Sequence, residues 1–422
     1  MSEGHYCRPL YLSWVFTLQV FFVGMLILPT SFQLERGVVL AFLGLIAAVL
    51  ALQHWRVHRD ILALWLATMV VGVCGIIWGV INGAPGALRV STVYLVWPAL
   101  YLLFIGLAHG LPVMRQLEGA LLFGIVLATA MALTVLGAGL FGFGESIYSL
   151  LEFQDAGFGG YEGFVEFRIY NLTTVMYGFP FVVTLLMTRR QELHGARKVG
   201  LWILVTLMGV VALGSGRRAF WLVVMMTPFV ALVFLQLSAQ RFGLAAALGV
   251  TVKIGAIVAL AVAWAVMEFD LEPSVLVQEF VAAFSGQEES SGLRYEQAGA
   301  LWRAFEGSPL VGIGLGSSVE VIRSEEQPWA YELAYLSLLK SVGFLGFLVY
   351  AAAVVWIAVR GMALARRDAE FAAMFVPVAV ALVCFLVMNV TNPYLEKFDY
   401  LWVIFLPVAL INAGLTPRSH DA

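Results

Sequence analysis

Apolar runs of about the ~20 residues that a helix needs to cross a bilayer recur along almost the whole chain. Twelve runs can be counted between polar segments, at residues 10–29, 37–53, 61–82, 91–109, 117–142, 171–188, 200–216, 219–237, 243–267, 331–357, 371–390 and 398–414. This pattern predicts an all-α fold, a polytopic transmembrane helical bundle of about twelve spans.

Two of the polar segments, 143–170 and 268–330, are much longer than the others. They divide the chain into three parts. Residues 1–267 hold spans one to nine and the smaller loop, residues 268–330 form the large loop, and residues 331–422 hold spans ten to twelve and a tail. The large loop contains a short helical pattern, whereas the smaller loop is rich in glycine and aromatic residues and is expected to be irregular.

The composition agrees with a membrane protein, and the charges predict its orientation. Apolar residues make up 61% of the chain and charged residues 12%, against roughly 45–50% and about 25% in soluble domains. With the N-terminus in the cytoplasm, thirteen of the 24 Lys and Arg residues fall in inner loops and termini and nine in outer loops. The positive-inside rule therefore predicts cytoplasmic termini and places both long loops outside.

Four short motifs lie in order between residues 168 and 346. They are residues 214–220 (GSGRRAF), 291–294 (SGLR) with Trp302 behind them, 308–316 (SPLVGIGLG), and Tyr335-Leu336 followed by residues 343–346 (GFLG). In their order and spacing, these motifs resemble those of the O-antigen ligase and polymerase family, membrane glycosyltransferases of the GT-C class. Ligases of that family carry a histidine where this chain has Glu332, which favours a polymerase.

The resemblance implies an enzyme of the bacterial inner membrane with its active site at the periplasmic face. The implied donor is a glycan on polyprenyl (undecaprenyl) diphosphate. The implied acceptor is a second lipid-linked glycan, so that repeat units of O-antigen or exopolysaccharide are polymerised. In a ligase the acceptor would instead be lipid A core or a protein. Membrane lipids and a chain-length regulator are the other implied partners, and no nucleic acid is expected.

The chemistry of such a donor explains why cations are expected in the outer loops. The donor leaves as a diphosphate, so catalysis needs positive charge that binds it and stabilises its developing charge. A guanidinium meets phosphate oxygens with two parallel hydrogen bonds and stays ionised near a membrane. The expected diphosphate-binding residues are Arg168, Arg217, Arg218, Arg294, Arg303, Gly312 and Gly314, of which Arg217 and Arg294 are also expected to act in catalysis.

These residues have structural alternatives. An arginine at a span end can hold its charge in the interface or pair with a neighbouring acid. Arg303, nine residues after Arg294, is expected on the same helix face. The glycine run could let backbone amides approach a diphosphate, or it could be a plain turn that returns the chain to the membrane.

Glycosyl transfer also needs a base that takes the proton from the attacking sugar hydroxyl. Glu332, at the start of the tenth span, is the best-placed carboxylate and the expected catalytic residue, although it could simply pair with an arginine. Weaker candidates are Glu162 and Glu296. Lys340, two turns below Glu332, could pair with a carboxylate or face a polar cavity, and the last outer loop offers Asn389, Asn392, Glu396 and Asp399 for the acceptor side.

Two other classes of protein can be weighed against an enzyme. A transporter could have as many spans and buried arginines, but the two repeated halves expected of many transporters are not visible. A structural assembly partner would not need arginines at several span ends. No cofactor is expected and, because the outer loops lack a compact acidic pair, the predicted glycosyltransferase is metal-independent.

Overall fold

The computed structural model describes residues 4–161, 164–189, 192–238, 248–256, 259–260 and 289–416 of the 422-residue chain. The first half contains α1 (Gly4–Ile27), α2 (Gln33–His54), α3 (Arg59–Ile81), α4 (Ala87–Ser91), the π-helical η1 (Thr92–Val96), α5 (Trp97–Leu107), α6 (Leu111–Leu140), α7 (Gly144–Leu150) and the 3₁₀ turn η2 (Glu152–Gln154). The second half contains β1 (Gly157–Tyr161), β2 (Phe164–Arg168), α8 (Leu172–Thr188), α9 (Gly195–Gly214), α10 (Arg218–Leu237), α13 (Glu289–Gly307), α14 (Ala334–Ala365), α15 (Ala369–Met388), the 3₁₀ turns η3 (Tyr394–Glu396) and η4 (Phe398–Tyr400), and α16 (Trp402–Leu415).

The all-α, multi-pass character is confirmed, but the number of spans differs from the expected twelve. Within the described residues, ten helices are long and apolar enough to cross a membrane, with α4, η1 and α5 forming one of them. The sixth expected span is α8, a shorter apolar helix of 17 residues. The ninth, residues 243–267, lies mostly outside the described residues.

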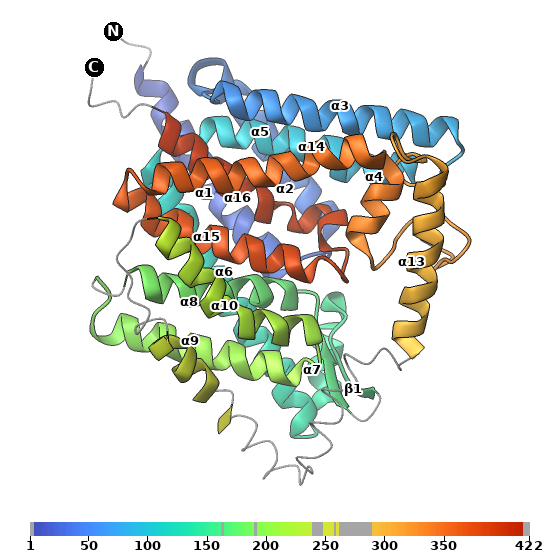
Figure 1. Ribbon diagram of the computed structural model, residues 1–422. Coiled ribbons are helices and arrows are strands. Elements are labelled where there is room, and N and C mark those ends of the chain that lie inside the picture. The colour runs from blue at the N-terminus through green and yellow to red at the C-terminus, as the bar shows by residue number, and fades with distance from the viewer. Residues whose placement is uncertain are drawn as a thin grey trace.

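Helices α8 and α15 form the centre of the bundle. Nearly every residue of α8 is buried, and 78% of the apolar window of α15 is buried. Both helices are apolar on all sides, as expected of helices enclosed by others. α8 packs against α6, α9, α10 and α15, and α15 also contacts α14 and α16. Figure 1 shows this arrangement, with α3 and α14 on the far side of α15 from α9.

The expectation that residues 143–170 are irregular is wrong. After α7 and η2, β1 and β2 form an antiparallel hairpin in which Gly157 faces Arg168 and Tyr161 faces Phe164. A glycine of α6 lets the hairpin pack closely, since a Cβ on Gly139 would overlap the ring of Phe158. The hairpin is thus fixed on α6 by an aromatic side chain.

The tenth span is interrupted by a glycine, and a loop hydrogen-bonds to the backbone at the break. α14 runs from 334 to 365, later and longer than the predicted 331–357, and Gly343 inside it has non-helical dihedrals (φ 64°). The break frees the carbonyls of Lys340 and Ser341, which accept from the amides of Ile313 and Gly314, both at 2.9 Å. Backbone at membrane depth must be satisfied within the protein, and the glycine run does this.

The same run also contacts α3. The Leu315 amide donates to the Gly75 carbonyl (2.9 Å), and a Cβ on Gly79 would lie 2.3 Å from the Leu315 carbonyl oxygen. The loop between α13 and α14 is therefore inserted between two membrane helices. α13 crosses the end of the bundle where α7 and β1 lie, while α1 begins and α16 ends at the opposite end (Figure 1).

Candidate functional site

The expected base and one expected diphosphate ligand meet at the end of the bundle that α13 crosses. Arg294 on α13 donates through Nε to Oε2 of Glu332 at 2.5 Å, although 38 residues separate them in the chain. Arg323, which the sequence did not single out, pairs with the other oxygen, Oε1. Glu332 lies two residues before α14 rather than on it. Its side chain is 16% exposed, against 34% for Arg294 and 52% for Arg323.

Helix α13 places Arg294 by packing one face against the bundle. Gln297 and Leu301, three and seven residues later, are buried on that face. The expectation that Arg303 shares the face is wrong, since nine residues at about 100° each amount to a further half turn. Arg303 is instead exposed and pairs with Glu320 at the surface. Glu296, the weaker carboxylate candidate on α13, is exposed, and Glu162 lies outside the described residues.

A buried ammonium lies next to this ion cluster. Lys340, in the first turns of α14, is 1% exposed and donates to the carbonyl and hydroxyl oxygens of Ser317, the latter at 2.8 Å. Its Nζ lies 5.0 Å from the centre of the Tyr331 ring, a favourable cation–π position. The Tyr331 hydroxyl accepts from the Val319 amide at 2.6 Å. The inserted loop thus supplies the groups that a charge within a span needs.

The last outer loop brings a second carboxylate to the same place. Glu396, at the end of η3, lines a cavity together with Asn389, which directly follows α15, and Tyr335 of α14. Burial raises the pKa of Glu396 to about 8, while the Lys340 ammonium and the Ser337 hydroxyl act in the opposite direction. Glu396 also contributes to the raised pKa of Tyr331, which burial mainly causes. Glu332 follows Tyr331 directly in the chain, and the charge of Glu396 acts on the same phenol.

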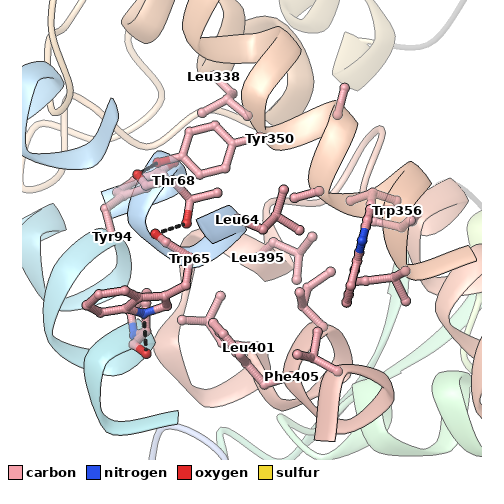
Figure 2. Close-up of a pocket in the computed structure, with 18 of the residues that line it drawn as sticks. Leu64, Trp65, Thr68, Tyr94, Leu338, Tyr350, Trp356, Leu395, Leu401 and Phe405 are labelled. Carbon is pink, nitrogen blue, oxygen red and sulfur yellow. Dashed lines mark hydrogen bonds between the residues drawn. The ribbon is translucent and has the colours of Figure 1, made fainter. Parts of the chain in front are cut away.

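The cavity has a volume of about 450 Å³ and is mostly apolar. Figure 2 shows its lining, with Leu64 and Trp65 from α3, Tyr350 and Trp356 from α14, and Phe405 from α16. Its volume falls in the range of about 300–1,000 Å³ that is typical of ligand pockets. Glu396 and Asn389 are its most polar side chains, so the cavity has one polar region and a long apolar remainder.

Arg217 lies close enough to the last outer loop for its charge to act there. It forms the N-cap of α10, after a turn in which Gly216 has a φ of 62° and Ser215 Oγ accepts from the Arg217 amide. Its charge acts on two residues of that loop. Burial lowers the pKa of Lys397, Asp399 opposes this, and Arg217 lowers it further. Burial raises the pKa of Tyr394, and Arg217 lowers it.

Residues 394–397 therefore lie within range of the charges of both Arg217 and Lys340. The structure places the two remaining predicted arginines as follows. Arg218, partly buried, is the first residue of α10, and Arg168, exposed, ends β2, where its charge acts on Tyr170. Neither is among the residues that contact Glu332 in the described part of the chain.

The amides of the glycine run are already occupied. Gly312 donates to Ser308 and Gly314 to Ser341, both at 2.9 Å. A Cβ at Gly312 would lie 2.5 Å from the backbone of α14, and one at Gly314 would lie 2.4 Å from the backbone of α3. This geometry agrees with the second alternative for the glycine run, a turn packed against membrane helices, and not with amides that bind a diphosphate.

No family model and no curated protein sequence matches this chain.

Sequence reasoning missed Arg323, Ser317 and Tyr331. No periodic pattern marks residues 308–333, so their side chains could not be assigned to a face. Tyr331 was the one with a visible signal, because it stands directly before Glu332.

Two of the acceptor-side candidates of the last outer loop make contacts within the protein. Asn389 Oδ1 accepts from the Leu395 amide, and Asp399 pairs with Arg36. In the described part of the chain, no three His, Cys, Asp or Glu side chains group together as metal ligands would.

Proposed function

We propose that this protein is a glycosyltransferase of the bacterial inner membrane, acting at its periplasmic face without a metal ion. It transfers a glycan from polyprenyl (undecaprenyl) diphosphate to a lipid-linked glycan acceptor. Repeated transfer polymerises repeat units of O-antigen or exopolysaccharide. The residues that carry out the reaction are Arg217, Arg294 and a carboxylate at the same site.

The observation that carries the proposal is the contact between Arg294 and Glu332, the expected diphosphate ligand and the expected base. A second guanidinium, that of Arg323, reaches the same carboxylate. Two forked cations around one anion form a site that also suits the oxygens of a diphosphate. The site lies at the end of the bundle that α13 crosses, where a lipid-linked donor could enter from the membrane.

The cavity supports a donor with an apolar chain. Its lining is contributed by α3, α5, α14 and α16, all of them membrane-length or within membrane-length segments. Its polar region contains Glu396. The charge of Lys340 acts on Glu396, and the charge of Glu396 acts on the Tyr331 phenol. We propose that an isoprenoid chain occupies this cavity and that its diphosphate is bound by Arg294 and Arg323, which lie outside the cavity lining.

The reaction follows from this arrangement. The acceptor hydroxyl attacks the anomeric carbon in line with the diphosphate, and the arginines stabilise the charge that develops on the leaving group. Arg217, whose charge acts on Tyr394 and Lys397, can bind a second phosphate oxygen. A carboxylate takes the proton of the hydroxyl.

The test is chain extension by the purified protein in lipid nanodiscs. The substrate is the lipid-linked single repeat unit isolated from cells that lack this chain. Wild-type protein should convert it into a ladder of longer lipid-linked glycans and release polyprenyl diphosphate. Arg294→Lys should lose most of this activity, because a point charge cannot replace the bidentate fork.

Arg115→Lys is the matched control. Arg115 pairs with Glu370 on an exposed surface, so this variant should extend chains at the wild-type rate. A wild-type protein that leaves the single repeat unit unchanged, under conditions where it is folded, would exclude the proposed activity. Full activity of Arg294→Lys would exclude Arg294 as a diphosphate ligand.

A further inference from the structure

The site holds two carboxylates, and their surroundings differ. Glu332 has both oxygens engaged, Oε2 by Arg294 at 2.5 Å and Oε1 by Arg323. To accept a proton from a substrate hydroxyl, it would have to release one of these guanidinium groups. Glu332 is thus well placed to hold the arginines and poorly placed to act as the base.

Glu396 is in the opposite situation. It lines the cavity, where a ligand could reach it, and no arginine pairs with it in the described part of the chain. From α14 it is faced by the Lys340 ammonium and the Ser337 hydroxyl. The charge of Glu396 also acts on the phenols of Tyr94 in η1 and Tyr331 in the inserted loop. The charge of its sequence neighbour Lys397 interacts favourably with Asp399 and unfavourably with Arg217.

We propose that Glu396 accepts the proton of the attacking hydroxyl, and that Glu332 is a positioning residue that holds Arg294 and Arg323 in place. This division of roles rests on the proposed function. The acceptor oxygen forms a bond to the anomeric carbon while the bond from that carbon to the diphosphate oxygen breaks. The bonding electrons leave with the diphosphate, and the proton passes to the Glu396 carboxylate and then to solvent.

The titration of Glu396 is consistent with this role. Burial raises its pKa to about 8, and a base is most effective when its pKa lies near the working pH. The base must be ionised, so the rate of transfer should rise with pH and level off above about 8. The Ser337 hydroxyl stabilises the ionised form, and removing it should move this rise to higher pH.

The experiment measures initial rates of chain extension and donor binding across pH for wild type, Glu396→Gln, Glu396→Asp, Ser337→Ala and Glu332→Gln. Glu326→Gln, an exposed carboxylate in the loop before α14, is the control. Glu396→Gln should lose about 100-fold or more in rate while it binds donor normally. Glu396→Asp should keep more activity, because it retains the carboxylate. Ser337→Ala should shift the rate profile to higher pH, whereas Glu332→Gln should mainly weaken donor binding.

The outcomes separate the two proposals. If wild-type protein neither binds nor extends a polyprenyl-diphosphate glycan, the proposed function fails. If it does, but Glu396→Gln extends chains within threefold of wild type, Glu396 is not the base. Loss of rate with intact donor binding in Glu332→Gln would assign the base to Glu332. Should Glu396→Gln fail to fold, an unshifted pH profile in Ser337→Ala would still overturn the inference.

Discussion

Replacing Gly314 by alanine tests how the glycine run is used, and it needs no substrate. Gly314 has a φ of 100°, a conformation that side chains rarely adopt, and a new Cβ would lie 2.4 Å from the Cα and amide nitrogen of Gly79 in α3. The contacting atoms belong to backbone, so no flexible side chain can move aside. The strained dihedral costs about 1–3 kcal/mol and overpacking about 1–3 kcal/mol more. We expect a total loss of about 2–6 kcal/mol.

The measurement is thermal unfolding of the purified variants in detergent, with Gly307→Ala as the matched control. Gly307 ends α13 in a helical conformation with open space around its Cβ position, so alanine there should be neutral or slightly stabilising. Gly314→Ala should melt several degrees below wild type. A Gly314→Ala protein that melts like wild type would refute the inserted loop. If a Gly314→Ala protein melts like wild type but no longer binds the donor, the amides of the glycine run bind the donor diphosphate.

Three further predictions concern orientation, packing and pH. Single cysteines at Ser290 and Arg197 should differ, with only position 290 labelled by a membrane-impermeant thiol reagent in cells whose outer membrane has been made permeable; labelling at 197 alone would invert the orientation. Arg36→Met should destabilise the protein by about 3–5 kcal/mol, because it leaves Asp399 buried without its cation. The double variant Arg36→Met/Asp399→Leu should unfold at a higher temperature than that single variant, and equal melting of both would contradict this. Because burial raises the pKa of Glu396 from 4.5 to about 8, the folded protein binds more protons than the unfolded chain in this interval, and the free energy of unfolding falls as the pH rises. At about 1.4 kcal/mol for each pKa unit the loss is at most about 5 kcal/mol between pH 5 and 9, and melting curves of Glu396→Gln should lack this part of the pH dependence.

The spans were predictable because length and hydropathy alone decide which segments can cross a bilayer. The break in α14 was not, because a window average barely registers one glycine among apolar neighbours. Gly343 is non-helical only because residues 309–315 supply partners for the backbone groups that it frees. Such a pairing joins segments about 30 residues apart, and no local pattern encodes it.

The candidate site was predictable in part for a related reason. Arg294 and Glu332 stood out as single residues whose charge needs an explanation beside a membrane, and the structure brings them together. Arg303 was misplaced because its helical phase was misjudged, and Arg323 was missed because its segment has no helical phase at all. In an irregular loop, side-chain direction is decided by tertiary contacts that become visible only in three dimensions.

The inserted loop also connects the two carboxylates. It holds Ser317 against the Lys340 ammonium, and it carries Tyr331, whose ring lies under that ammonium and whose next neighbour is Glu332. Lys340 in turn acts on Glu396 across the cavity wall. A shift of the loop would therefore move the counter-ion of the arginines and the electrostatic surroundings of the proposed base together. This coupling would give the glycines at 312 and 314 a role in the proposed chemistry even though their amides face the protein.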